Sequence, residues 1–154
     1  LEMTSSVKVQ QADGRSLSLD LPDLPLFDAV LIDAPCSGLG TLHRHADARW
    51  RQTPATVQAL SQLQSELLRA AAQQVKPNGS LVYATCTLHP LENEWVVQQF
   101  LAEFPQWRIE PPQDPMFADF QSAAGWIKVW PHRQPMDGFF MVRLQRTDSI
   151  WLQG

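Results

Sequence analysis

The sequence has few cysteines, no long apolar run and no excess of basic residues, and each of these absences excludes a class of protein. Two cysteines in 154 residues cannot form the disulfide framework of a small secreted domain, and no group of histidines and cysteines has zinc-ligand spacing. No apolar run approaches the roughly 20 residues of a membrane-spanning helix, and the start lacks a signal segment. We therefore expect a cytoplasmic protein without a metal and without a membrane anchor.

The net charge is −4, because 16 Asp and Glu outnumber 12 Lys and Arg. This balance argues against general binding of a phosphate backbone by this chain alone. One stretch differs, since three arginines and two histidines between His43 and Arg51 face a single acidic residue, Asp47. A solvated loop is the alternative interpretation of that stretch. With 44% hydrophobic residues, the chain is long enough for one domain with a core.

Apolar runs and a helical repeat predict a strand, a helix and a second strand in the middle of the chain. Residues 27–32 and 80–85 are short apolar runs, which indicate buried parallel strands. The threonine–proline pair at 53–54 is typical of a helix start, and apolar residues then recur every three or four positions as far as Val75. Residues 77–79 (PNG) end this helix. Such a unit closes as a right-handed crossover between parallel strands.

The remaining patterns predict shorter elements and an unpatterned tail. A second helix begins at Pro90 and ends at Pro105. Residues 111–124 hold three prolines without a period and predict a long loop. Short strands are expected at residues 7–10, 126–130 and 139–144, and a connecting loop at residues 17–26. We therefore expect one domain over residues 1–146 and a tail over residues 147–154.

Each of the two cysteines follows one of the predicted parallel strands. Cys36 comes shortly after the first strand and Cys86 directly after the second. Neighbouring strands lie about 4.8 Å apart, and ligands of open parallel sheets bind outside the carboxyl ends of the strands. Two thiols and the carboxylate of Asp33 are thus expected in one cleft. A partly exposed thiolate with a lowered pKa is a strong nucleophile, whereas a cysteine on such a loop is otherwise a small buried apolar residue.

Three motifs carry a resemblance: residues 33–40 (DAPCSGLG), 83–87 (YATCT) and 90–94 (PLENE). They resemble the paired cysteine motifs of the Sun-type RNA (cytosine-5) methyltransferases, in particular the bacterial members that methylate small-subunit ribosomal RNA. The match is extended by Asp47 with Arg49 and Trp50, by residues 76–79 (KPNG) and by residues 137–140 (DGFF). The resemblance covers most of the chain, from about residue 9 to residue 146.

The resemblance implies an α/β fold, the C-terminal part of the doubly wound, Rossmann-like sheet of S-adenosylmethionine-dependent methyltransferases. In that family the cysteine of the Thr-Cys motif, here Cys86, attacks carbon 6 of a cytosine in ribosomal RNA, and carbon 5 then takes the methyl group of S-adenosylmethionine. Asp33 is expected to hydrogen-bond or protonate the pyrimidine edge, and to border the cofactor. Cys36 is expected to serve proton removal from carbon 5 and breakdown of the adduct.

Two further acidic sites follow from the resemblance, each with an alternative. Asp13 resembles the acidic residue beside the adenine of the cofactor, and the alternative is an ordinary turn aspartate. Residues 92–94 (ENE) are expected to support the Cys86 loop, and the alternative is that their carboxylates stabilise the first turn of a helix. One small departure from the family is Ala46, where relatives often carry a proline.

The main departure is the family's glycine-rich cofactor loop, which is expected upstream of residue 1 and is not replaced by residues 38–40 (GLG). We therefore expect a catalytic fragment that is inactive alone, and one that self-associates through the sheet edge that missing strands leave open. One alternative is a non-catalytic RNA-binding remnant of the same fold. Another is a cysteine-dependent hydrolase or redox domain, which is disfavoured because the sequence lacks a CxxC motif and a matching His/Asp set.

Overall fold

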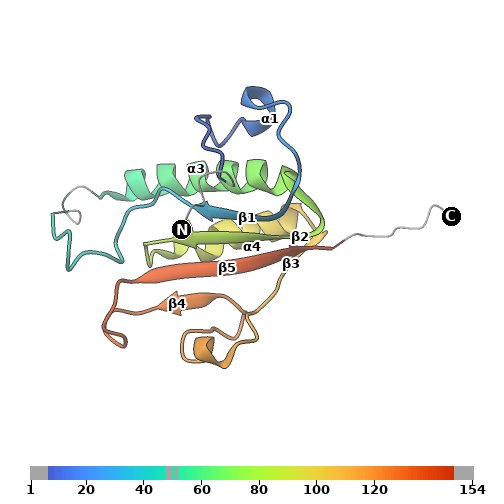
Figure 1. Ribbon diagram of the computed structural model, residues 1–154. Helices are drawn as coiled ribbons and strands as arrows, with labels where there is room; N and C mark the ends of the chain where they lie inside the picture. The colour runs from blue at the N-terminus through green and yellow to red at the C-terminus, as the bar shows by residue number, and fades with distance from the viewer. Residues whose placement is uncertain (1–6, 48–49, 51, 148–154) are drawn as a thin grey trace.

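The computed structural model describes residues 7–47, 50 and 52–147, and its centre is a mixed five-stranded sheet (Figure 1). The strands are β1 (Phe27–Asp33), β2 (Val75–Thr85), β3 (Trp107–Ile109), β4 (Ile127–Val129) and β5 (Phe139–Arg146). β1 and β2 are parallel, and β5 runs antiparallel to β2 on the other side. β3 and β4 both pair with β5, so the main order is β1-β2-β5-β3.

The helices are α1 (Leu17–Asp20), α3 (Pro54–Gln73) and α4 (Glu94–Glu103), together with the 3₁₀ turns η1 (Pro90–Glu92) and η2 (Pro115–Phe117). α3 is the crossover between β1 and β2 (Figure 1). Thr53 caps its N-terminus: its hydroxyl accepts from the Thr56 N–H, and the Thr56 hydroxyl accepts from the Thr53 N–H. This reciprocal bonding satisfies two backbone donors of the first turn, which is why the helix begins there.

One hydrophobic core joins α3 and α4 to the sheet. Its fully buried side chains come from α3 (Leu68), α4 (Val97), β2 (Leu81, Tyr83) and β5 (Leu144). Burying one such aliphatic side chain stabilises the fold by about 1.5–3 kcal/mol. The core therefore fixes the crossover helix and the two central strands as one unit, and the loops that follow β1 and β2 start from a rigid base.

The expected α/β architecture is confirmed in its central part. β1 and β2 form the predicted parallel pair, α3 begins at Pro54 as predicted, and β4 and β5 lie where strands were expected. The second helix also ends before Pro105, although it is divided into η1 and α4 at Asn93, whose backbone leaves the helical region.

Several local predictions are wrong. Residues 7–10 form no strand, and among the described residues no strand pairs with them, so their backbone groups lack a ladder. α3 ends at Gln73, and Val75 starts β2 because it pairs with Phe27. Residues 77–79 therefore lie within β2, where Asn78 takes a φ of 59° at an irregularity of the ladder. Three elements were not predicted: the single turn α1, inside the loop expected at residues 17–26, the 3₁₀ turn η2, inside the loop expected at residues 111–124, and the three-residue β3.

β1 is the edge strand of the described sheet and is not buried as predicted. Val30 and Ile32 are partly buried against the core, whereas the alternate residue Leu31 is 68% exposed. Neighbouring strand residues point to opposite faces, so Leu31 lies on the face that the core helices leave uncovered. β1 therefore presents an unpaired edge and an apolar side chain to solvent within the described part of the chain.

Candidate active site

The parallel pairing of β1 and β2 brings the two cysteine loops together. Asp33 at the end of β1 lies opposite Ala84 of β2, and the Ala34 N–H donates to the Ala84 carbonyl at 2.9 Å. The chain leaves both strands at the same edge, and the sulfur atoms of Cys36 and Cys86 lie 3.3 Å apart. Both cysteines are free thiols and partly exposed. The expected meeting of the two thiols is thus observed, and their chemical roles stay predictions.

The two thiols differ in their surroundings. Burial, followed by the hydrogen bond with Cys86, raises the pKa of Cys36 to about 12. The Cys36 thiol therefore keeps its proton at neutral pH, and either sulfur atom can donate in the contact between the two thiols. Two thiols within hydrogen-bond distance are an arrangement that suits one nucleophile and one proton carrier.

The two aspartates expected at the site lie in different environments. Asp33 is exposed at the carboxyl end of β1, on the same edge as the thiols. Asp13 lies in the turn before α1, where Arg15 donates to it from its backbone N–H at 2.9 Å and its guanidinium at 2.7 Å. These bonds lower the pKa of Asp13 to about 2. None of the hydrogen bonds found for Asp13 in the described residues reaches a cysteine loop, so its observed contacts are those of a turn aspartate.

The buried carboxylate of Glu92 links the loops that carry Cys36 and Cys86. Glu92 of η1 is fully buried, and it accepts from the Ser37 N–H at 2.8 Å, the Ser37 hydroxyl at 2.5 Å and the Gln64 amide at 3.0 Å. The neighbouring Asn93 accepts from the Thr85 hydroxyl at 2.6 Å and donates to the Thr87 carbonyl at 2.9 Å. Residues 92 and 93 thus support the cysteine loops through direct contacts, as predicted for the Cys86 loop, whereas Glu94, for which the same was predicted, pairs with Lys128.

Ser37 and Gln64 are site residues that sequence reasoning missed. Gln64 is fully buried although it is polar, and it lies one turn before Leu68 on the face of α3 that the core covers. A polar residue at an apolar position of a helical repeat is the signal that identifies such a group, because burial requires a hydrogen-bond partner. The amide nitrogen of Gln64 meets this need by donating to the Pro35 carbonyl at 2.8 Å as well as to Glu92, whereas its Oε1 has no hydrogen-bond partner among the described residues.

Gly40 and Gly138 connect a third loop, which contains Asp137 and Gly138, to the two cysteine loops. The Gly40 N–H donates to the Cys86 carbonyl at 3.0 Å, and the Gly138 N–H donates to the Gly40 carbonyl at 2.8 Å. A Cβ on Gly40 would lie 2.1 Å from the Gly138 oxygen and 2.7 Å from the Cys86 oxygen. Only glycine therefore fits between the two loops. Asp137, beside Gly138, forms an ion pair with Arg44, and Nε2 of His43 lies 3.1 Å from its carboxylate, so residues 43–44 lie against the same turn.

Part of the basic stretch lies outside the described residues, including Arg49 and Arg51. Among the described residues, no group of three or more His, Cys, Asp or Glu has the arrangement of a metal site. The same part of the chain contains no helix that is long and apolar enough to cross a membrane.

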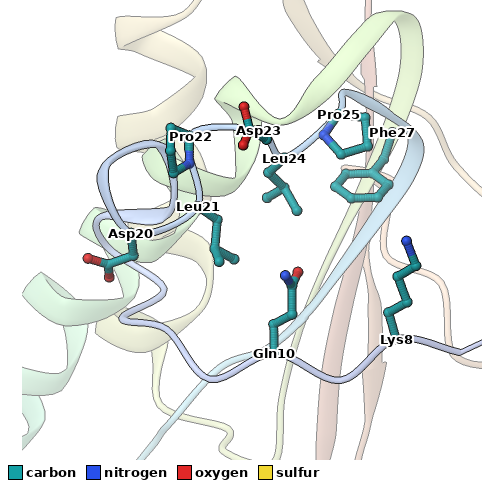
Figure 2. A pocket seen from close by; sticks show the side chains of 9 residues that line it. All are labelled: Lys8, Gln10, Asp20, Leu21, Pro22, Asp23, Leu24, Pro25 and Phe27. Atoms are coloured by element: carbon teal, nitrogen blue, oxygen red, sulfur yellow. The ribbon is translucent and has the colours of Figure 1, made fainter.

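A hollow of about 570 Å³ lies at the opposite end of β1 (Figure 2). Its walls come from the N-terminal segment, with Lys8 and Gln10, and from the loop before β1, with Leu21, Pro25 and Phe27. Because ligands of open parallel sheets bind at the carboxyl ends of the strands, this hollow is not the candidate active site.

Comparison with known proteins gives the family. A family model described as 16S rRNA methyltransferase RsmB/F matches residues 1–145. The chain is 44% identical over 145 residues to the probable ribosomal RNA small subunit methyltransferase B of Synechocystis sp., covering 93% of this chain and 32% of the relative. It is 39% identical over 149 residues to the ribosomal RNA small subunit methyltransferase F of Klebsiella pneumoniae, covering 95% of this chain and 31% of that protein.

The fold has solved counterparts. The crystal structure of NSun6 from Pyrococcus horikoshii with SFG matches with a TM-score of 0.76 and 30% identity, over 93% of this chain and 35% of that one. The open sheet thus has the Rossmann-like fold of S-adenosylmethionine-dependent methyltransferases, as expected. The chain belongs to the 16S rRNA methyltransferase RsmB/F family, which confirms the expected cofactor class for the family. It spans about a third of the length of the curated relatives that it matches.

The glycine contact at the cysteine loops yields a prediction. We expect Gly40→Ala to lower the free energy of unfolding by about 1–3 kcal/mol, because the added methyl group overlaps backbone atoms that have no room to move. The measurement is urea unfolding of the native and variant chains. Leu39→Ala is the control, since it changes the same loop without adding atoms. Equal stability of Gly40→Ala and the native chain would contradict the observed packing.

Proposed function

We propose that the protein transfers a methyl group from S-adenosylmethionine to carbon 5 of a cytosine in ribosomal RNA, through a covalent adduct on Cys86. The observation that carries the proposal is the pair of sulfur atoms 3.3 Å apart at the carboxyl edge of β1 and β2. Names of relatives support the class of substrate, since they are ribosomal RNA small subunit methyltransferases. A cytoplasmic location is part of the proposal, because bacterial ribosomal RNA lies there.

Cys86 is the nucleophile in this proposal. Its sulfur lies 3.3 Å from that of Cys36, whose pKa is raised to about 12, so the protonated Cys36 thiol can donate a hydrogen bond to a thiolate at Cys86 before attack. Attack on carbon 6 forms the sulfur–carbon bond and moves the ring electrons toward the pyrimidine edge. Asp33, exposed at the end of β1, is placed to hydrogen-bond or protonate that edge.

The residues present fit part of a cofactor site. Asp33 supplies an exposed carboxylate at the sheet edge where ligands of such folds bind, which suits a positively charged ligand. Asp13 is engaged by Arg15, so it would contact the cofactor only after that bond is released or shared. S-adenosylmethionine supplies an electrophilic methyl group. We propose that residues 1–146 are part of a catalytic domain, that the segment 147–154 is a tail, and that residues 1–154 alone do not complete the reaction.

Release requires removal of the proton on carbon 5 and departure of the Cys86 sulfur from carbon 6. We assign proton removal to the thiolate form of Cys36, which first loses its own proton to solvent and lies next to Cys86. Among the described residues, no histidine or carboxylate hydrogen-bonds to either sulfur, which leaves the hydrolase alternative without a triad-like partner. The two thiols thus divide the reaction into bond formation and bond release.

The division of roles predicts opposite effects of two substitutions in the complete protein. Cys86→Ala should abolish both methyl transfer and covalent capture of RNA that carries 5-fluorocytidine, because the first bond cannot form. Cys36→Ala should slow release, so that a covalent protein–RNA species accumulates with ordinary cytosine. Denaturing electrophoresis with substrate RNA and S-adenosylmethionine measures both. A shifted band with Cys86→Ala and none with Cys36→Ala would reverse the assignment.

The raised pKa of Cys36 predicts the sign of a pH dependence. Between pH 7 and 9 the group stays below its pKa of about 12, so its thiolate fraction rises about tenfold for each pH unit. If Cys36 takes the proton from carbon 5, decay of the isolated adduct should accelerate with pH in the same proportion. The adduct formed by Cys36→Ala is the control, and its decay should not follow this slope. Decay of the native adduct that is independent of pH would exclude Cys36 as the base.

The open edge of β1 leads us to propose that residues 1–154 self-associate when isolated. Leu31 is 68% exposed on that strand, and a second copy can satisfy both the apolar surface and the unpaired backbone. We expect light scattering to give a mass above that of one chain, and Leu31→Lys to shift it toward the monomer. Leu19→Lys is the control, because Leu19 is equally apolar and 81% exposed but lies on α1. A monomeric native chain at high concentration would contradict the proposal.

A further inference from the structure

The residue that follows each cysteine contacts the same carboxylate. Ser37, directly after Cys36, donates to Glu92 from both its N–H at 2.8 Å and its hydroxyl at 2.5 Å. Thr87, directly after Cys86, lies 3.4 Å from the same carboxylate through its hydroxyl. The hydroxyls of Ser37 and Thr87 are also 2.8 Å apart, so the three side chains close a small network beneath the sulfur pair.

The Cys36 loop is held on both sides of its cysteine. Gln64 donates to the carbonyl of Pro35, which precedes Cys36, and to Glu92, which holds the residue after it. The Glu92 backbone is fixed in turn, because the buried Tyr83 hydroxyl donates to the Glu92 carbonyl at 2.6 Å. Contacts from α3, β2 and η1 thus determine the position of the Cys36 sulfur atom.

Because Glu92 is buried, its carboxylate needs every hydrogen-bond donor of this network. A carboxylate taken out of water is costly unless donors replace its hydration, and the partners found for Glu92 in the described residues are amides and hydroxyls. Removing the carboxylate would leave the Ser37 N–H and one Gln64 proton buried without this acceptor, and would leave the Ser37 hydroxyl only the Thr87 hydroxyl, 2.8 Å away. The loop would move to satisfy these groups, and Cys36 would move with it.

We propose that Glu92 is a positioning residue that sets the distance and orientation of Cys36 relative to Cys86. It does not touch substrate, and it acts only through Ser37, Thr87 and Gln64. This role rests on the proposed function for its catalytic consequence: release needs both thiols at the same base, whereas RNA binding does not. Loss of Glu92 should therefore lower kcat and leave KM within about threefold.

The test uses the complete protein and the dithiol–disulfide equilibrium of Cys36 and Cys86 with glutathione. Oxidation removes one proton and one electron from each thiol and forms one Cys36–Cys86 bond, while one glutathione disulfide becomes two glutathione thiols. The equilibrium constant reports how closely the two sulfur atoms are held. We expect Glu92→Ala to lower this constant about tenfold or more, and Ser37→Ala, which removes only the hydroxyl donor, to have an intermediate effect.

Glu92→Gln is the conservative variant. It keeps an oxygen for the Ser37 N–H and Gln64, and the Ser37 hydroxyl can accept from the new amide, so its constant should stay within about threefold of native. Glu94→Ala is the matched control, since Glu94 is only two residues away but pairs with Lys128 at 2.5 Å. It should lower the unfolding temperature without moving the constant.

The outcomes separate this proposal from the proposed function. The positioning role would be overturned by any of three results. The equilibrium constant for the Cys36–Cys86 disulfide could be unchanged in Glu92→Ala, it could fall equally in Glu94→Ala, or the native protein could form no disulfide between the two cysteines. Methyl transfer to cytosine is assayed on the same proteins. If the native protein lacks that activity while the constants fall as expected, the proposed function fails and the positioning role stands. If Glu92→Ala misfolds, the intermediate constant of Ser37→Ala and the near-native constant of Glu92→Gln remain as the test.

Discussion

The parallel register between β1 and β2 determines where every group of the candidate site lies. Because Asp33 is opposite Ala84, strands β1 and β2 end at the same level of the sheet. Cys36 comes three residues after Asp33, and Cys86 comes two residues after Ala84. A shift of this register by one residue would turn the side chains of β1 to the opposite face and displace the Cys36 loop along the sheet. The core beneath α3 prevents such a shift, since Val30 and Ile32 pack against it.

Much of the fold was accessible from sequence because its central elements carry strong local signals. The apolar run of β1, the capping pair before α3 and the proline after α4 each depend on residues close in sequence. The strand predicted at residues 7–10 failed because alternation of side chains says nothing about whether a partner strand is present. The prediction that the helix extends to Val75 failed for a related reason. Val75 pairs with Phe27, far away in sequence, and this pairing outweighed its place in the helical repeat.

The candidate site also contains some residues that the sequence revealed and others that it did not. The cysteines and Asp33 could be found because they lie at or shortly after the ends of strands, and the sheet topology then brings the two thiols together at the edge where Asp33 lies. Ser37 carried no such signal, and Gln64 carried only its polar character at an apolar position of the helical repeat, because their importance arises from meeting one buried carboxylate across three elements. The raised pKa of Cys36 was equally hidden, because it depends on burial that only the folded chain defines.

The fixed backbone of the Cys86 loop has a consequence for the entropy of the first chemical step. The Cys86 carbonyl is held by the Gly40 N–H, the preceding Thr85 by Asn93, and the following Thr87 by Asn93 as well. What remains free is the rotation of one side-chain bond that carries the sulfur. A nucleophile with a single rotor loses little conformational freedom when it bonds to a substrate, whereas a cysteine on a loose loop would also have to order its backbone, at about 1–2 kcal/mol for each residue.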